Sequence, residues 1–439
     1  MKFTKFGKAL LMTALSIGVV LSVSSCVQSY TVGFLYVTGT VTAQSSGNGI
    51  ISGFKIDHNT GKLSPIHGLP LSSGGANPVR AVLLTGSKFL YVLNRGANSS
   101  GGSDCTTADP CSNPNITQFA VGGNGILTSQ ETFYPLGINP FRMVADTTGN
   151  YLYVLDHDSP SNASCALALG PSATTCGVIE AYQVNQTTGR LQLVVNAQVT
   201  SASGAALPYF PVPANPIDLL LSSGYILALS GTPALGDSVF PYTVASGGSG
   251  QLTVNQNSAQ PLNIRQAGAI VAGTGYVYVL DDEPITVNGT TSPSQILPFS
   301  VGSGGALQAQ ISGIVADDPT LSNPIYMLVE SKGKYVYVAN QGNLTDTSNA
   351  ASGIAGYVID PSQHTLSFIA GEPFPIGSGP QCIVEDPSDQ FIYTANFNDS
   401  TVTGRVVDPN SGVLTSLRVT SSYTLTGPPT WCLVDGRTS

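Results

Sequence analysis

One short pattern recurs along the chain, and it limits the possible folds more than any other feature. Its clearest copy is residues 334–340, KYVYVAN, in which aromatic and β-branched residues alternate before a polar turn residue. Such a run is typical of a buried β-strand. Counting this one, seven copies recur roughly every 50 to 75 residues, which in a strand-rich chain predicts a β-propeller. The other copies begin at Phe34, Phe89, Tyr151, Tyr225, Tyr276 and Phe391.

Each copy is one part of a longer repeat. An extended segment entered through a proline precedes it, and a segment of alternating apolar and polar residues follows, as in residues 178–184. A glycine turn and a Leu-bearing strand, such as Gly61-Lys62-Leu63, end the unit. Four strands joined in this way make one propeller blade. The entry prolines are Pro78, Pro140, Pro216, Pro324, Pro380 and Pro428, and the fifth copy, near residues 263–270, lacks one.

The order of the pieces predicts how the ring closes. The repeats begin at a second strand, near Phe34, and end with an extra first strand at residues 430–435. Pairing these two strands would complete the last blade and remove two exposed sheet edges. We therefore expect an all-β, seven-bladed propeller of four-stranded antiparallel blades over residues 31–439. We expect Trp431 to fill the final gap between blades.

These motifs resemble the bacterial β-propellers known as lactonase-like or YVTN-repeat proteins. The resemblance rests on Tyr337-Val338-Ala339-Asn340, on the entry prolines and on the Gly-x-Leu turns, and it covers the chain after its leader. Some members hydrolyse sugar lactones such as 6-phosphogluconolactone, and others are surface proteins of adhesive or unknown role. The resemblance thus implies a fold, but it does not choose one function.

The first 30 residues have the features of an export signal. Three lysines among the first eight residues precede an apolar stretch, residues 9–21, that is short for a membrane span. Val23-Ser24-Ser25-Cys26 resembles a lipobox. The sequence therefore predicts a signal peptide at 1–25 and a lipidated tether at 26–30 carried by Cys26. The protein would then be an outer-membrane or cell-surface lipoprotein, periplasm-facing or extracellular; an ordinary signal peptide is the alternative.

Composition and charge exclude some classes of partner. Only 9% of residues are charged, the net charge is −9, and no basic run is present, so nucleic acid is not expected as a ligand. We expect a small anionic ligand or an envelope protein as the partner, membrane contact through the anchor alone, and a monomer.

Long segments between the second and third strands are the places where binding is expected, because all of them fall on one face of the ring. Cysteines occur in two of these segments, and an even number of cysteines follows Cys26, which favours disulfides in an exported protein. Two disulfides would each constrain one of these loops, and they would join Cys105 to Cys111 and Cys165 to Cys176. Cys382 and Cys432 are either bridged, locking the ring, or two unpaired buried thiols. The long segments are residues 95–115, 157–177, 281–295 and 341–353.

One position of the first strand, counted back from each aromatic strand, could form a polar collar in the central channel. Two arginines on neighbouring blades there could bind a carboxylate or a phosphate. Alternatively, they pair with nearby carboxylates such as Asp146 or Asp218 and only support the channel. The predicted collar residues are Arg80, Arg142, Asp218, Ala267, Tyr326 and Cys382, with Cys432 in the closing strand.

The sequence identifies no certain catalytic group. Arg80, Arg142 and His157 are the candidates, because lactone hydrolysis needs a base for water and a cation for the oxyanion. Asp281-Asp282-Glu283 is an acidic cluster that could hold Ca²⁺, although it lacks the spacing of a calcium loop. No Gly-x-Ser-x-Gly elbow and no P-loop occur, and no cofactor is expected.

Three functions remain open. The first is a lipid-anchored propeller that binds a ligand or partner through its long-loop face, the second is a lactone hydrolase, and the third is a structural module of the envelope. An enzyme requires a deep polar pocket where arginine meets a carboxylate or His157. A protein binder requires an apolar patch on the loops, and a structural module requires neither.

Overall fold

The structure is a computed structural model, and it describes most of the chain after the leader. The described residues are 30–41, 48–84, 86, 88–102, 105–106, 108–201, 203–231, 237–245, 249–254, 260–262, 264, 266–287, 289–310, 313–344 and 351–436. The predicted signal peptide and Cys26 lie outside them. Among the described residues, no helix combines the length and the apolar character needed to cross a membrane.

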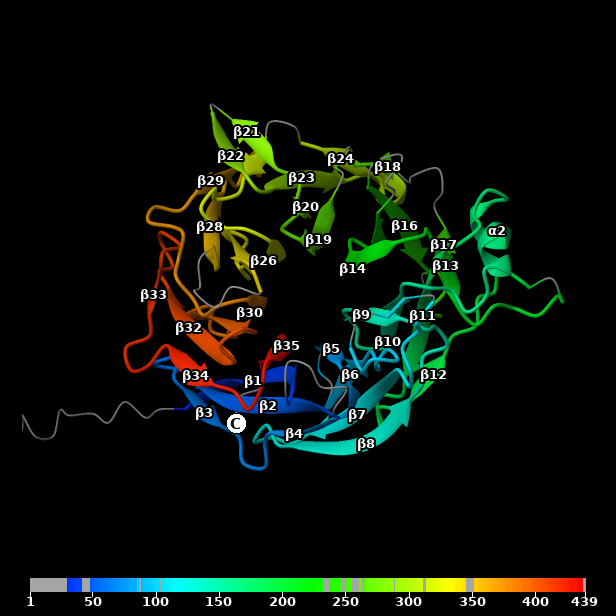
Figure 1. The fold of residues 1–439 in the computed structure, drawn as a ribbon, viewed down its shortest axis with the longest axis horizontal. Helices are drawn as coiled ribbons and strands as arrows, with labels where there is room; N and C mark the ends of the chain where they lie inside the picture. The colour runs from blue at the N-terminus through cyan, green and yellow to red at the C-terminus, as the bar shows by residue number, and fades with distance from the viewer. Residues whose placement is uncertain are drawn as a thin grey trace, which may run out of the picture. The chain divides into compact units, whose positions relative to one another are not determined.

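Residues Thr31–Ser439 form one compact unit, a seven-bladed β-propeller of antiparallel sheets, as predicted (Figure 1). Blade 1 is β5 (Pro78–Leu83), β6 (Phe89–Asn94), β7 (Asn115–Val121) and β8 (Leu127–Phe133). Blade 2 is β9 (Pro140–Ala145), β10 (Tyr151–Asp156), β11 (Gly177–Val184) and β12 (Leu191–Leu193), with β13 (Phe210–Val212) on β11. Blade 3 is β14 (Pro216–Ser222), β15 (Tyr225–Ser230), β16 (Ser238–Val244) and β17 (Leu252–Val254), with β18 (Gln260–Pro261) on β16.

The remaining blades repeat this order. Blade 4 is β19 (Ala267–Ala272), β20 (Tyr276–Asp281), β23 (Gln295–Val301) and β24 (Leu307–Ala309), with β25 (Val315–Ala316) on β23. Blade 5 is β26 (Pro324–Val329), β27 (Tyr335–Asn340), β28 (Gly353–Ile359) and β29 (Leu366–Phe368). Blade 6 is β30 (Pro380–Glu385), β31 (Phe391–Asn396), β32 (Thr401–Val407) and β33 (Leu414–Ser416), with β34 (Ser422–Thr424) on β32.

Blade 7 closes the ring with strands from both ends of the unit. β35 (Pro429–Asp435) pairs antiparallel with β1 (Thr31–Thr40), which is followed by β2 (Asn48–Asp57) and β3 (Leu63–Pro65), and β4 (Leu71–Ala76) lies on β2. In Figure 1 the red β35 lies beside the blue β1. The predicted closure by the C-terminal strand is therefore confirmed.

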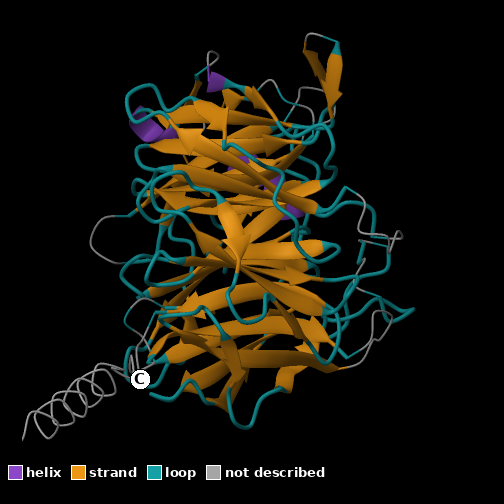
Figure 2. Ribbon diagram, turned by 90° about the vertical axis from the view of Figure 1, so that its left-hand side faces the viewer, coloured by secondary structure: helices purple, strands orange, loops and turns teal. Residues whose placement is uncertain are grey.

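The first strands of the blades surround the central channel, each next to the first strand of the following blade. Few elements depart from the blade pattern, and Figure 2, which shows the ring edge-on, contains strands and connecting loops with very little helix. α2 (Ala163–Leu169) lies between β10 and β11, the hairpin β21 (Ile285–Val287) with β22 (Thr290–Ser292) lies between β20 and β23, and η2 (Ser303–Gly305) precedes β24.

The hydrophobic core is divided among the seven interfaces between neighbouring blades. Each interface has its own cluster of buried side chains, such as Tyr91 and Leu93 of blade 1 against Met143 and Leu152 of blade 2. The alternation of side chains along a strand explains this division, because each blade must bury both of its faces. The near-continuous apolar character of the repeated second strand follows from it.

A hydrogen bond between blades explains why tyrosine recurs in that strand. The Tyr91 hydroxyl, fully buried, donates to the carbonyl of Gly189 in the third-to-fourth-strand turn of the next blade, at 2.6 Å. A ring of the same strand packs on that glycine, where a Cβ would lie 2.7 Å from Phe89. The equivalent bonds join Tyr36 to Gly125, Tyr337 to Gly412 and Tyr393 to Gly61.

Candidate functional site

The first strands share a local irregularity that sets which side chains reach the channel. In β5, Pro78 pairs with Asn94, but Arg80 pairs with Leu93, so one extra residue follows the entry. A bulge of this kind re-aims the side chain beside it. The same shift occurs in all seven first strands, and the residues after it are Arg80, Arg142, Asp218, Ala269, Tyr326, Cys382 and Trp431.

Two members of the predicted collar are therefore wrong. In blade 4, Ala269 occupies the position instead of Ala267, which pairs with Asp281 before the bulge. In the closing strand, Trp431 occupies it, and Cys432 is one residue further along. The entry to blade 4 lacks the proline that marks the register elsewhere, and β35 starts at the second of two consecutive prolines, so counting along the sequence led to the wrong position in these two strands.

The structure brings Arg80, Arg142 and Asp218 together across three neighbouring blades. Arg142 Nε donates to Asp218 Oδ1 at 3.1 Å, and Arg80 Nη2 lies 3.8 Å from the same oxygen. Asp218 also accepts the backbone N–H groups of Leu219, at 2.9 Å, and of Ile270, at 3.2 Å. The expected alternative partner Asp146 instead accepts hydrogen bonds within its own turn.

Arg80 also lies between two aromatic rings. Its guanidinium carbon is 3.5 Å from the centroid of the Trp431 ring and 5.7 Å from that of Tyr326, and the two rings meet edge to face at 5.0 Å. Burial and the charge of Arg142 lower the pKa of Arg80 to about 10, while Asp218 opposes this shift. Such a guanidinium is held by cation–π contact as well as by its ion pair.

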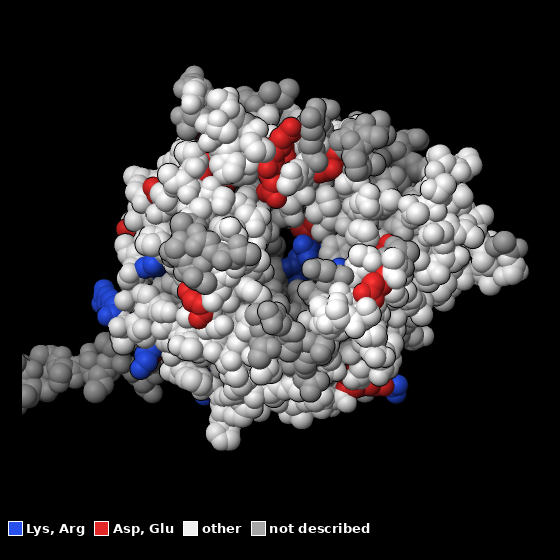
Figure 3. All heavy atoms as spheres, in the orientation of Figure 1, with Lys and Arg blue, Asp and Glu red and all other residues white. Residues whose placement is uncertain are grey.

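We use the name collar for Arg80, Arg142, Asp218, Tyr326 and Trp431. Two guanidinium groups share one carboxylate here, so the collar carries an excess of positive charge. Arg142 remains the more accessible of the two, with 28% of its side chain exposed against 9% for Arg80. Figure 3 shows positive side chains in the hollow at the centre of one face. The arrangement can attract an anion, or polarise a carbonyl oxygen, without a metal.

A cavity of about 530 Å³ occupies the channel beside the collar, and Arg80, Asp218, Tyr326 and Trp431 line part of it. Two residues further along each first strand, every blade contributes an aliphatic side chain, which we call the aliphatic ring. Its members pair with the repeated tyrosine position of the second strand, and they are Val82, Val144, Leu220, Val271, Leu328, Val384 and Leu433.

His157 does not belong to the collar. It follows β10, its backbone N–H donates to Asn139, and its Nδ1 lies 3.2 Å from Asp158 Oδ2. The ring is 6.3 Å from that of Phe141, and 39% of the side chain is exposed. His157 is not among the residues that line the cavity. The structure therefore does not bring His157 together with Arg80 and Arg142 at one site.

The acidic cluster after β20 does not gather its side chains around one point. Asp281 is buried and accepts hydrogen bonds from the Gln295 side chain and the Glu283 backbone. Burial and the neighbouring carboxylates of Asp281 and Asp317 raise the pKa of Asp282 to about 7. Within the part of the chain that the structure describes, no three His, Cys, Asp or Glu side chains are grouped so that they could hold a metal ion.

All three cysteine pairs form disulfides: Cys105–Cys111, Cys165–Cys176 and Cys382–Cys432. The sequence left open whether Cys382 and Cys432 are bridged or are two unpaired thiols, and the structure shows the bridge. It joins β30 to β35 and therefore fixes the closing strand beside the collar.

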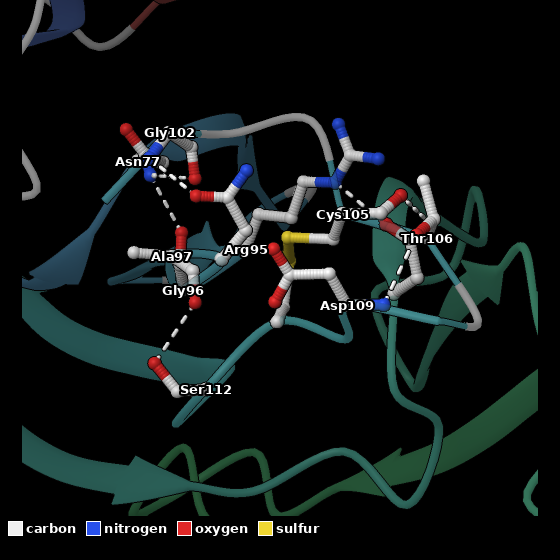
Figure 4. The surroundings of a disulfide bond; sticks show 12 residues. Asn77, Arg95, Gly96, Ala97, Gly102, Cys105, Thr106, Asp109 and Ser112 are labelled. Carbon is white, nitrogen blue, oxygen red and sulfur yellow. Dashed lines mark hydrogen bonds between the residues drawn. A yellow bond between two sulfur atoms is a disulfide. The ribbon is translucent and has the colours of Figure 1, made fainter. Parts of the chain in front are cut away.

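The loop closed by the Cys105–Cys111 bridge contacts the entry to blade 2. Figure 4 shows the surroundings of this bridge, with Arg95 beside Cys105. The Asn139 side chain donates to the Cys105 carbonyl at 3.0 Å and accepts from Arg95 Nε at 2.7 Å. Asn139 precedes the strand that carries Arg142, so this stapled loop helps to position the collar. Arg95 was not singled out from the sequence, and Trp431 was not assigned a role in the site. Arg95 could have been noticed as a basic residue directly after the aromatic strand.

Comparison with known proteins agrees with this fold. Residues 316–432 match the model of the family described as "Lactonase, 7-bladed beta-propeller". A provisionally assigned 6-phosphogluconolactonase from Bacteroides fragilis is similar in structure, with a TM-score of 0.63, 16% identity, and 92% of this chain and 98% of that chain covered. The periplasmic gluconolactonase of Pseudomonas aeruginosa has a TM-score of 0.62 and 17% identity, with 93% and 99% covered.

No curated protein matches the chain at a significant level. At these identities the solved structures demonstrate the fold alone, whereas the family match covers blades 5 and 6 and part of the closing strand β35. The chain is thus a seven-bladed β-propeller, and its predicted resemblance to the lactonase-like propellers is confirmed.

Proposed function

We propose that this protein hydrolyses a lactone at the collar. The observation that carries the proposal is the convergence of Arg80, Arg142 and Asp218 beside a channel cavity, because it places two cations and one carboxylate at a single point. The family match and the lactonases among similar structures support the same reaction class.

The chemistry follows from what each group can do. The lactone carbonyl oxygen would lie against the guanidinium groups, with Arg142 the more accessible donor, and these stabilise the negative charge that develops on that oxygen. Asp218 would accept the proton of the attacking water as the C–O bond forms. The ring C–O bond then breaks, its oxygen takes up the proton held by Asp218, and the new carboxyl group loses its proton to solvent, so that a hydroxycarboxylate leaves. The product carries one negative charge, which the collar can also bind.

The test is turnover of the purified protein on a panel of sugar lactones, with and without Ca²⁺. We expect hydrolysis that Ca²⁺ does not change, and about a 100-fold lower kcat/KM for Arg142→Gln, since removing one oxyanion donor costs that much in known enzymes. Arg190→Gln is the matched control, because Arg190 is 67% exposed on an outer strand turn and pairs with Glu131. His157→Ala should change kcat/KM less than twofold. Turnover no faster than spontaneous opening would exclude the proposal.

A second candidate is binding without turnover. Asp218 already accepts hydrogen bonds from the Arg142 guanidinium and from two backbone N–H groups, and it forms an ion pair with Arg80, which together reduce its capacity to take a proton from water. In that case the collar would retain an anionic ligand at the long-loop face. The single tryptophan of the chain, Trp431, lies in the collar, so quenching or enhancement of its fluorescence by an anion in the absence of hydrolysis would favour this candidate.

We also propose that the protein works outside the cytoplasm. Three disulfides are compatible with an oxidising compartment, and they support the export expected from residues 1–25. Lipidation at Cys26 remains a prediction, and mass spectrometry of the mature N-terminus tests it. An unmodified cysteine, or cleavage at another residue, would leave a soluble exported protein instead.

A further inference from the structure

The channel changes character within a few residues of the collar. On each first strand, the residue directly after the bulge-shifted position (Arg80 and its equivalents) is buried between blades. Met143, Leu219 and Ile383, for example, are 2%, 4% and 1% exposed. The following positions form the aliphatic ring, and most of its members are only half-buried. Residues of both sets line the cavity. Since side chains alternate along a strand, the buried first set is directed between neighbouring blades, and the half-buried aliphatic ring is directed toward the channel.

Beyond the aliphatic ring the cavity remains apolar. Ala272, Val329 and Val434 line it there, together with Glu385. Among the described lining residues below the collar, Glu385 is the one that can ionise. It lies at the far end, where it accepts the backbone N–H of Ser331 at 2.7 Å. The cavity therefore has a cationic end, an apolar middle and a carboxyl group at the opposite end.

A polyhydroxylated sugar is a poor match for this section, because its hydroxyl groups would lose water without finding hydrogen-bond partners on aliphatic walls. An alkyl chain fits the walls, since burying its methylene groups against them removes apolar surface of both from water. The charge distribution also fixes the direction of such a ligand. Its anionic or carbonyl head belongs at Arg80 and Arg142, and the reverse orientation would place an anion beside Glu385.

We propose that the natural ligand is an amphiphile: an alkyl-substituted lactone, or the hydroxyalkanoate formed when it opens, with its head at the collar and its tail along the aliphatic ring. The lactone head of this ligand rests on the proposed function, whereas its alkyl tail rests on the shape and lining of the cavity. From the collar to Glu385 and Val434 the strands advance by about three residues, roughly 10 Å. At about 1.3 Å per carbon, a tail of about eight carbons spans that distance.

The experiment is a titration of Trp431 fluorescence with butanoate, hexanoate, octanoate and decanoate, and with gluconate and 6-phosphogluconate. We expect affinity to rise about threefold to fourfold for each added methylene up to about eight carbons and then to level off. Gluconate should bind no better than butanoate. Affinity that does not depend on chain length, or 6-phosphogluconate binding more tightly than octanoate, would overturn the inference.

Two variants locate the tail. Leu328→Asn places an amide in the aliphatic ring and should flatten the dependence on chain length while butanoate still binds. Val419→Asn is the control, because Val419 is 61% exposed outside the channel. Val384→Asn provides a second test of the ring if Leu328→Asn fails to fold, as judged by circular dichroism. An unchanged chain-length dependence in both folded ring variants would contradict the proposal.

The two proposals can fail separately. Chain-length-dependent binding of alkanoates with no turnover of alkyl or sugar lactones would retain the amphiphile and exclude hydrolysis. Rapid turnover of sugar lactones with no preference for alkyl lactones would retain hydrolysis and exclude the amphiphile.

Discussion

Removing the hydroxyl of one repeated tyrosine should destabilise the ring, whereas removing that of another should not. Tyr91 and Tyr153 occupy equivalent positions in blades 1 and 2, and both are 0% exposed. The Tyr91 hydroxyl donates to the Gly189 carbonyl at 2.6 Å. The Tyr153 hydroxyl is buried and has no hydrogen-bond partner among the described residues. The pair therefore separates the hydrogen bond from the bulk of the ring.

The expected magnitudes follow from this difference. Tyr91→Phe leaves a buried carbonyl without its partner, which costs about 1–3 kcal/mol of unfolding free energy. Tyr153→Phe removes a buried hydroxyl that gains nothing from a partner, so its effect should lie within about 0.5 kcal/mol of zero or be stabilising. For roughly 400 residues the entropy of unfolding is about 0.9 kcal/mol per degree, so the Tyr91 variant should melt about 1–3 °C lower.

Urea titration of the oxidised protein, followed by far-ultraviolet circular dichroism, measures the difference, and differential scanning calorimetry provides the Tm. Both variants keep the aromatic ring and hence the packing between blades. If Tyr153→Phe lost as much stability as Tyr91→Phe, the hydrogen bond would not be the reason that tyrosine recurs in this strand.

Two further predictions concern ring closure and pH. Replacing both Cys382 and Cys432 by Ala should lower the free energy of unfolding by about 4 kcal/mol, because that bridge spans 50 residues. The same change at Cys105 and Cys111, which are 6 residues apart, should lower it by about 2 kcal/mol. Equal urea midpoints for the two double variants would contradict this order. Burial and two neighbouring carboxyl groups raise the pKa of Asp282 to about 7 from an ordinary 3.8, so its neutral form favours the folded state below pH 4 and that contribution is lost as the pH rises through 7. Asp282→Asn should therefore remove a decline in stability between pH 4 and 7, and parallel pH profiles of the two proteins would show that the group does not titrate there.

Sequence reasoning recovered the blade pattern because the pattern is local. Alternating side chains, entry prolines and turn glycines report on the strand that contains them, so the seven second strands and the closing strand could be recognised without any contact between blades. His364 illustrates the limit of this approach. It stands where other blades have the turn glycine, with φ of 56°, and its ring stacks on Tyr276 at 3.8 Å.

The collar was harder to predict because it depends on a bulge that has no fixed sequence. Arg80, Arg142, Asp218 and Tyr326 could be placed by counting from an entry proline, and the ion pairs then follow from proximity. Where the proline is missing or doubled, counting alone chose Ala267 or Cys432 in place of Ala269 or Trp431. The contact of Arg80 with Trp431 joins opposite ends of the propeller, and no periodicity in the sequence reports it.

The closing strand also sets the order in which the site can be made. Arg80 is synthesised with blade 1, but the tryptophan that covers it arrives on β35, after the five intervening blades. An emerging chain thus has a charged, uncovered Arg80 until β35 docks on β1 and Cys382 meets Cys432. Assembly of the binding site and completion of the ring are one event, so any lesion that frees β35 should abolish ligand recognition while most blades remain folded.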